Sequence, residues 1–290
     1  MGIVAQLFVN GLIAGAIYAL VAAGFSLIYS TSKVIHFAHG VTVAFSAYFL
    51  YLFFSLLSIN FGFSVILAVL CASLLGYGMH HIYKQLRIKK ASNVILLIAS
   101  FVLLILLESI ILLSFGADVK TIGYLKVAKG LEFAGAIITP LQIVIVVVAA
   151  ILLIGVYFFM KKTRIGKAMR AVSDNKDVAA IVGISSERIY MWAMTLGSAI
   201  AGVAGILIGL EQNLEPTMGT NLIIKGFTGA IIGGIGSVPG AVLGSFLLGF
   251  AENYGIWWLP SGYKDAIAFI ILFIFLIFKP TGILGIKKKD

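Results

Sequence analysis

Two glutamates and two histidines interrupt long apolar stretches of this sequence, and their side chains are candidates for proton or metal chemistry. Glu108 and Glu252 lie among apolar residues, where a charge at the centre of a membrane helix costs about 2.5–3.5 kcal/mol. We therefore expect each carboxyl to face a bundle interior, either on a solute path or in a helix–helix hydrogen bond. His36 and His39 are three residues apart and could share a helix face, as metal ligands do, but no third ligand is nearby. The pair predicts a kinked helix end that lines a cavity, without a metal.

Motifs for enzymatic chemistry are missing from the sequence. It contains neither His-Glu-x-x-His nor Gly-x-Ser-x-Gly, so an intramembrane enzyme is poorly supported. It also lacks Gly-x-x-x-x-Gly-Lys-Ser/Thr, so any ATP that drives this protein must bind another polypeptide. The turn Gly234-x-Gly236-x-x-Pro239-Gly240 follows no predicted strand and is no dinucleotide fingerprint. Because broken helices at membrane depth line solute paths, Gly234, Gly236 and Pro239 are candidate path residues, and no cofactor is expected.

The composition indicates that lipid is the solvent for most of the surface. Of the 290 residues, 61% are hydrophobic and 11% are charged, whereas soluble domains carry about 25% charged residues. The net charge of +10 does not indicate nucleic-acid binding, because no basic face interleaved with aromatic residues is present. The single cysteine, Cys71, allows no intrachain disulfide.

Nine apolar segments are predicted to enter the membrane. A helix needs about 20 apolar residues to cross the hydrocarbon layer. Leu222–Trp258 is too long for one straight helix and contains glycines and Pro239, so it is predicted to enter twice, with a break near residues 222–240. Eight crossings plus one re-entrant piece at Ile223–Ile235 is the alternative. The other segments are Ile3–Tyr29, Gly40–Ser58, Phe63–Tyr83, Asn93–Phe115, Ile137–Met160, Ile189–Leu210 and Lys264–Phe278.

The basic residues orient these segments. Of the 21 lysines and arginines, sixteen are Lys33 and those within residues 84–90, 161–188 and 279–289. Cytoplasmic loops collect lysine and arginine, so the sixteen mark the cytoplasmic side. The N-terminus is then predicted outside and the C-terminus inside, in a multi-pass protein of the cytoplasmic membrane. The other five, assigned to the outer connections, are Lys120, Lys126, Lys129, Lys225 and Lys264.

The longest polar stretch of the chain is residues 161–188, on the predicted cytoplasmic side. Apolar residues recur within it, and Ser173 followed by Asp174 and Asp177 is typical of a helix start. We expect two short surface helices joined by a turn, forming a rigid knob that docks on a partner protein. The alternative is an ordinary basic loop that fixes orientation and touches lipid headgroups.

This stretch resembles the coupling loop of ABC importer permeases of the branched-chain amino-acid family, the LivH–LivM type. Further blocks with the same resemblance, in the same order along the chain, are Asn10–Leu20, His36–Gly40, Gly233–Gly240 and Lys279–Gly282. His36, Val41 and Glu108 depart from the family's usual asparagine, acidic and amide residues, and Asp177 replaces a usual glutamate. The residues of the coupling loop that match are Gly166, Ala168, Arg170, Ala171, Asp174, Asp177, Ala179, Ala180, Gly183 and Ile184.

The resemblance implies an all-α, polytopic helix bundle of the type II ABC importer class, formed by one transmembrane domain over residues 1–290. It implies a second permease subunit, two cytoplasmic ATP-binding subunits, an extracytoplasmic solute-binding protein and a bilayer as partners. Branched-chain or other hydrophobic amino acids are the implied cargo, with urea or short amides as the alternative. An ion-coupled secondary transporter, using Glu108 and Glu252, is the alternative from another class.

Two sets of site residues follow from the resemblance and from the residues themselves. The set expected to couple to the ATPases is Gly166, Arg170, Asp174, Asp177, Ala179, Ala180 and Gly183. The set expected on the translocation path is Asn10, His36, His39, Gly40, Glu108, Gly234, Gly236, Pro239 and Glu252.

Overall fold

The computed structural model describes residues 2–124, 130–133 and 135–285. Lys126, Lys129 and Lys287–Lys289, which enter the count of basic residues, lie outside the described residues. The all-α prediction is confirmed, with one small hairpin of strands β1 (Leu131–Phe133) and β2 (Ala136–Ile138). The helices are α1 (Gly2–Ser32), α2 (His39–Leu50, continued by a π-helical turn Tyr51–Leu56), α3 (Phe61–Ile88), α4 (Asn93–Phe115), α5 (Pro140–Lys162), α6 (Arg164–Asp174), α7 (Lys176–Ile181), α8 (Ser186–Glu211), α9 (Met218–Gly233), α10 (Val238–Gly255) and α11 (Lys264–Phe278, after a 3₁₀ turn Ser261–Tyr263).

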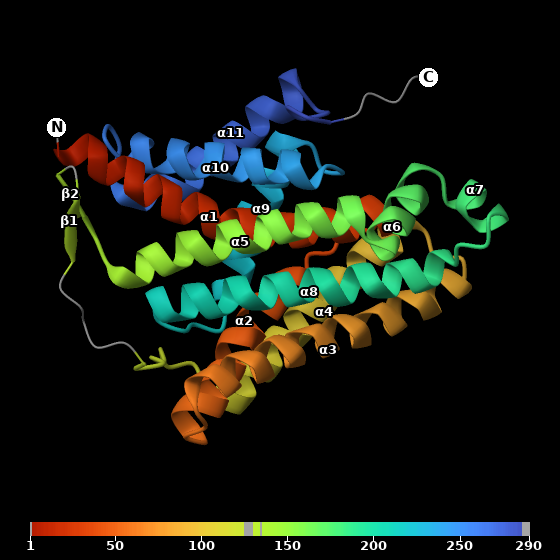
Figure 1. Cartoon of the computed structure of the whole chain (residues 1–290), viewed down its shortest axis with the longest axis horizontal. Coiled ribbons are helices and arrows are strands. Elements are labelled where there is room, and N and C mark those ends of the chain that lie inside the picture. The colour runs from red at the N-terminus through yellow and green to blue at the C-terminus, as the bar shows by residue number, and fades with distance from the viewer. Residues whose placement is uncertain (1, 125–129, 134, 286–290) are drawn as a thin grey trace.

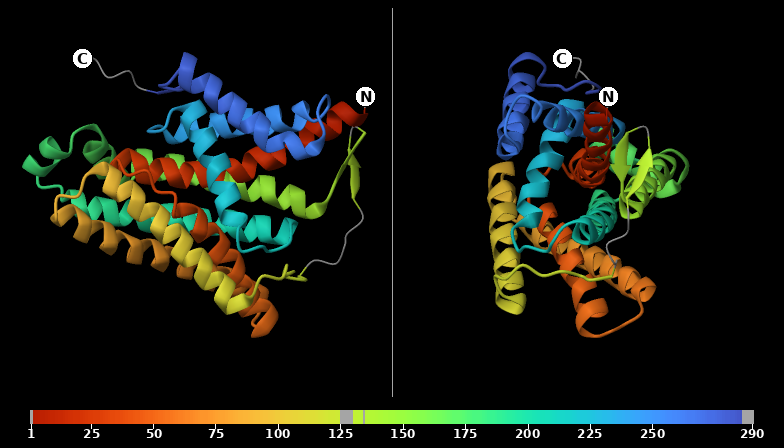
Figure 2. Two further views of the ribbon diagram at one scale, coloured as in Figure 1. Left: turned by 180° about the vertical axis from the view of Figure 1, so that it is seen from behind. Right: turned by 90° about the vertical axis from the view of Figure 1, so that its left-hand side faces the viewer.

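A helix forms over each of the segments predicted to enter the membrane. Among the described residues, seven helical segments are long and apolar enough to cross a membrane singly, and α9 with α10 forms a further, bent pair. The two helices of this pair meet at an angle of 114°, so α9 runs obliquely across the bundle, as Figure 2 shows. The break lies at residues 234–237, within the region that the glycines and Pro239 predict.

Helix α1 lies at the centre of the bundle and contacts α10, α8, α9 and α5 (Figure 1). Eighteen of its 31 residues are buried, whereas four of 23 are buried in α4 and two of 23 in α5. A helix that is apolar all round and buried is a core helix, and the outer helices expose their apolar residues. The exposed faces of α4 and α5 are therefore surfaces for lipid or for other membrane subunits.

The two ends of the bundle differ in character. The N-terminus and the β-hairpin lie at one end and α6 with α7 at the other, as Figure 1 shows. We call these the outer end and the inner end, following the orientation that the basic residues predict. The inner end carries the polar stretch of residues 161–188, and the outer end carries the connections after α4 and α8.

Non-helical backbone enters the bundle between α1 and α2. Helix α2 begins deep inside it, because the His39 ring lies against Gly24, well before the end of α1. The loop is paired internally: the Ala38 N–H donates to the Ser100 hydroxyl (3.1 Å), and the Gly40 N–H donates to the Phe37 carbonyl (3.0 Å). In lipid an unpaired backbone group is costly, so such loops persist only where protein partners surround them.

Small residues allow helices to approach one another closely, as their four-residue spacing favours in membranes. Gly11 and Gly15 of α1 lie against α10, where an added Cβ would be 2.7 Å from the rings of Phe250 and Phe246, respectively. In the bent pair, Gly233 lies against the backbone of Gly240. The central helix and the bent pair therefore pack backbone to backbone.

Replacing Gly244 by alanine should destabilise the fold, because the added methyl group would meet the Gly229 carbonyl oxygen and lie 2.5 Å from the Gly233 nitrogen. Overpacking of this kind costs about 1–3 kcal/mol, so the melting temperature of the purified chain in detergent should fall. Gly155→Ala in α5 is the matched control, since an added methyl group there meets nothing within 4 Å. Equal melting temperatures for the two variants would contradict the close contact between α9 and α10.

Candidate functional site

Helices α6 and α7 form the predicted pair of short helices at the inner end, and we call residues 164–184 the knob. Figure 1 shows α7 projecting beyond the ends of the long helices. Helix α6 holds the knob to the bundle, because Met169 and Val172 are buried in the main core. It starts tightly after α5: the Thr163 hydroxyl accepts from the Gly166 N–H (3.0 Å), and an added Cβ at Gly166 would meet the Phe159 carbonyl.

Helix α7 is closed at both ends by local hydrogen bonds. The Asn175 side chain accepts from the N–H groups of Asp177 (3.0 Å) and Val178 (3.1 Å). Gly183 has φ +82°, and the Gly183 and Ile184 N–H groups donate to the Ala180 and Ala179 carbonyls, which is a Schellman ending. The helix start predicted at Ser173 is wrong, because Ser173 lies in α6 and the extended backbone of Asn175 separates the two helices.

The tip of the knob presents apolar side chains to solvent. Val178, Ile181 and Val182 are 55%, 85% and 69% exposed. Of the seven residues predicted to couple, Gly166 and Ala179 are buried and the other five are exposed. Asp177, Ala180 and Gly183 lie in or directly after α7, whereas Arg170 and Asp174 lie in α6 and line a cavity at the inner end. Exposed apolar side chains rimmed by charges are typical of surfaces that contact another protein or a membrane.

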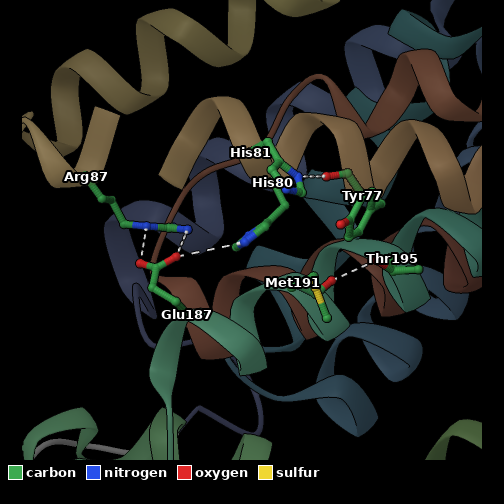
Figure 3. Close-up of polar contacts among 7 residues, drawn as sticks. All are labelled: Tyr77, His80, His81, Arg87, Glu187, Met191 and Thr195. Carbon is green, nitrogen blue, oxygen red and sulfur yellow. Dashed lines mark hydrogen bonds and ion pairs between the residues drawn. The ribbon is translucent and has the colours of Figure 1, made fainter. Parts of the chain in front are cut away.

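An ion-paired cluster anchors the chain where it leaves the knob (Figure 3). The Arg87 guanidinium, in the last turn of α3, donates to both carboxylate oxygens of Glu187 (3.0 and 3.2 Å), in the first turn of α8. The same guanidinium lies 4.5 Å from the centroid of the Tyr190 ring, and His80 Nε2 lies 4.0 Å from Glu187. The bidentate pair and the ring contact use the planar shape of arginine. The cluster therefore ties the exit of the knob to α3.

A cavity of about 530 Å³ opens at the outer end between α1, the end of α8, α9 and the start of α11. Its wall combines both charges with amides and apolar side chains. The predicted path residue Asn10 lies in this wall and accepts from the Gln6 amide (3.1 Å). The lining residues are Asn10, Ile13, Ala14, Ile17, Tyr18, Gln142, Ile208, Glu211, Gln212, Asn213, Glu215, Met218, Asn221, Leu222, Lys225, Asn253, Lys264 and Asp265.

Glu252 is buried beside this cavity in an ion pair. Its carboxylate accepts from the Lys225 ammonium (2.5 Å) and from the Tyr18 hydroxyl (2.9 Å). The Lys225 ammonium also pairs with Asp265 (2.7 Å). The assignment of Lys225 to an outer connection is wrong, because it lies in the middle of α9 and is 8% exposed. Its two carboxylate partners stabilise the ammonium charge inside the bundle, which lipid could not do.

Glu108 lies apart from Glu252, at the contact of α4 with α9. It is half-buried and accepts from the Thr220 hydroxyl (2.8 Å). It lines a second cavity, of about 380 Å³, together with Glu215 and Thr217. Glu108 therefore makes the helix–helix hydrogen bond expected of an intramembrane carboxylate and also borders an open space.

His36, His39 and Gly40 lie in the packed core and line neither the outer cavity nor the second one. His36 Nδ1 is 2.9 Å from the Tyr83 hydroxyl, and His39 Nε2 is 3.3 Å from the Val21 carbonyl. Within the part of the chain that the structure describes, no group of three histidine, cysteine, aspartate or glutamate side chains has the arrangement of a metal site. The two rings pack the deep start of α2 against its neighbours.

The break between α9 and α10 borders a cavity at the inner end. Gly236 and Pro239 line this space of about 890 Å³, together with Lys161 and Arg170, whereas Gly234 lies at the break itself with φ +114°. The outer and inner cavities share no lining residue. The path residues predicted in this turn therefore face the inner end of the bundle.

A family model decides what kind of protein this bundle is. The model described as "Branched-chain amino acid transport system / permease component" matches residues 7–276. The chain belongs to this permease family. It is 35% identical to the high-affinity branched-chain amino acid transport system permease protein BraD of Pseudomonas aeruginosa, over 97% of this chain and 95% of BraD. It is 32% identical to the corresponding LivH protein of Escherichia coli K12, over 97% of this chain and 94% of LivH.

A solved structure shares the fold of this permease. PsaBC from Streptococcus pneumoniae, in complex with Fab, superposes with a TM-score of 0.51 at 13% identity. The match covers 94% of this chain and 91% of the other. At this identity the likeness concerns the fold alone.

Sequence reasoning missed the partners of two charged residues in this permease. Lys225 is a lysine inside an apolar segment, so the sequence indicates that its burial in the membrane costs free energy. The sequence does not indicate that Glu252 and Asp265 are its partners. Arg87 carried no such signal, because it ends a basic helix like its neighbours and its partner Glu187 is 100 residues away. The Arg87–Glu187 pair joins α3 to α8, which are distant in sequence, whereas the Lys225–Glu252 pair joins the consecutive helices α9 and α10.

Arg87→Gln should loosen the first turn of α8 in this permease, because Glu187 then loses its bidentate partner. The pair is partly exposed and worth at most about 1 kcal/mol, so amide exchange in residues 185–190 should quicken by up to roughly five-fold. Hydrogen–deuterium exchange of the purified chain measures this change. Lys89→Gln, an exposed neighbour, is the control and should leave exchange unaltered. Equal exchange rates in the two variants would show that the Arg87–Glu187 pair does not stabilise the first turn of α8.

Proposed function

We propose that this chain is the permease subunit of an ATP-driven importer that moves branched-chain and other hydrophobic amino acids across the cytoplasmic membrane. The observation that carries the proposal is the knob: a capped helix pair at the inner end with exposed apolar side chains at its tip. The membership in the permease family and the names of BraD and LivH support the cargo. The whole of residues 1–290 forms one transmembrane domain in this proposal.

The energy source lies on other subunits in this proposal. The sequence has no phosphate-binding loop, so two cytoplasmic ATP-binding subunits dock on the knobs of this permease and of a second permease subunit. The exposed faces of α4 and α5 supply the apolar surface that lipid and the second permease cover. An extracytoplasmic solute-binding protein delivers cargo to the outer end.

The mechanism follows from the rigidity of the knob. Met169 and Val172 join it to the core, and the Arg87–Glu187 pair joins its exit to α3, so a displacement of the tip moves α5, α3 and α8 together. The separate outer and inner cavities are the two openings that such rocking would connect alternately. Cargo then enters from the outer end and leaves at the inner end, without chemistry on the permease itself.

Asp177→Arg should uncouple ATP hydrolysis from uptake while the protein still inserts, because it reverses a charge beside the docking tip. The measurement is ATP-dependent uptake of L-leucine by the reconstituted complex, alongside its ATPase rate. Lys89→Glu is the matched control, since it reverses the charge of an exposed residue at the inner end that lies outside the knob. Normal ATP-driven uptake by the Asp177 variant would refute the docking role, and uptake against a gradient without ATPase subunits would refute the proposed function.

Gly183→Trp should uncouple in the same assay by adding bulk at the end of α7. An added Cβ at Gly183 meets nothing within 4 Å, so the tryptophan side chain starts into open space at the exposed end of α7, where the partner is proposed to dock. The backbone strain of a non-glycine residue at positive φ is about 1–2 kcal/mol. Gly183→Ala carries that strain with little bulk and should remain coupled. Loss of coupling in both variants would assign the effect to strain.

A further inference from the structure

Lys225 holds two carboxylates that differ sharply in their surroundings. Glu252 belongs to α10 and is fully buried, and it also accepts from the Tyr18 hydroxyl. Asp265 belongs to the first turn of α11, and its side chain is 73% exposed. The ammonium lies between them, 2.5 Å from Glu252 and 2.7 Å from Asp265, and it borders the outer cavity.

The charges of this trio divide into a fixed pair and an exchangeable partner. Lys225 and Glu252 neutralise each other inside the bundle, and removing Lys225 would leave the buried Glu252 carboxylate without an ion-pair partner, which is strongly destabilising. Asp265 adds a second negative charge from the solvent side, where an ion pair contributes little. Once released, its carboxylate remains beside the N-terminus of α11, whose free N–H groups stabilise an anion. Breaking the ion pair between Asp265 and Lys225 therefore costs little free energy.

We infer that Lys225 is a binding site for the α-carboxylate of the cargo, with Asp265 occupying that position until cargo displaces it. The inference rests on the proposed function and names the chemical group of the cargo that the permease itself binds. The ligand class is zwitterionic amino acids with apolar side chains.

The remainder of the outer cavity fits the other parts of such a ligand. Glu211 and Glu215, at the end of α8 and in the connection to α9, supply carboxylates for an ammonium group. Ile13 and Ile17 of α1, with Leu222 of α9, supply apolar wall for the side chain. The cavity holds two lysines: Lys225, backed by a buried carboxylate, and Lys264, which donates to the Asn253 side chain (3.1 Å). Lys225, the separate carboxylates and the apolar wall match the three parts of an amino acid. A neutral amide such as urea has no carboxylate that could displace Asp265 from Lys225.

A purely structural role for the trio makes a different prediction. If Lys225 only joins α9, α10 and α11, then removing Asp265 weakens the fold and has no favourable effect on ligand binding. If Asp265 competes with cargo, its removal frees the ammonium and tightens binding. The sign of the effect of Asp265→Asn separates the two roles.

The test is binding of tritiated L-leucine to the purified full chain in lipid nanodiscs, with unlabelled L-leucine and L-leucinamide as competitors. Asp265→Asn should bind L-leucine roughly three-fold more tightly, the gain expected from losing one exposed competing ion pair. Asp118→Asn, which removes an exposed aspartate paired with Lys120 at 3.6 Å, is the matched control and should bind as the wild type does. L-Leucinamide, which lacks the carboxylate, should compete at least ten-fold less well than L-leucine.

The double variant Lys225→Met/Glu252→Gln removes both buried charges and should lose the preference for L-leucine over L-leucinamide. Unchanged or weaker L-leucine binding in Asp265→Asn overturns the inference, as does a double variant that folds and keeps the preference. Absence of measurable binding to both the wild type and Asp265→Asn overturns it as well. The binding assay contains no ATPase and does not depend on docking at the knob. An Asp177→Arg variant that binds L-leucine normally but does not couple ATP hydrolysis to uptake would therefore show a failure of docking and not of this site.

Discussion

The bundle depends on one constraint: backbone that is not helical must find its hydrogen-bond partners inside the protein, because lipid offers none. Among the described residues, non-helical backbone lies inside the bundle at residues 33–38 and 234–237. At the first break, Ser100 of α4 accepts from the Ala38 N–H. At the second, the Ser237 N–H donates to the Gly234 carbonyl, and the Ser237 hydroxyl accepts from the Gly240 N–H. Each break is therefore tolerated only within this particular packing, which gives the obliquely placed α9 a defined position.

The position of α9 connects the features that lie at the two ends of the bundle. Its middle carries Lys225 at the inner limit of the outer cavity, and its last residues lead into the turn that borders the inner cavity. Phe25 of α1 packs edge to face on Phe227 of α9 between these regions, with ring centroids 5.6 Å apart. A helix that contributes to both openings and packs on the central α1 is well placed to change the two together when the knob moves.

The sequence predicted the features that depend on length and composition. Nine apolar segments, a break at glycines and Pro239, and two short helices within residues 161–188 all follow from local patterns. It predicted poorly where a residue depends on partners distant along the chain. The partner of Lys225 is 27 residues away on another helix, and the partner of Arg87 is 100 residues away. His36 and His39 illustrate the same limit, because polar side chains expected at a cavity are buried among Tyr83, Val21 and each other.

The segment after α11 contributes to the bent pair in a way that ties together distant parts of the chain. The Ile283 and Leu284 N–H groups donate to the Ile232 and Gly233 carbonyls (2.9 and 2.8 Å), which end α9. These donors emerge from the ribosome only after α10 and α11 have been synthesised. The carbonyls that end α9 therefore obtain these two hydrogen-bond donors only after the whole of α11 has been synthesised.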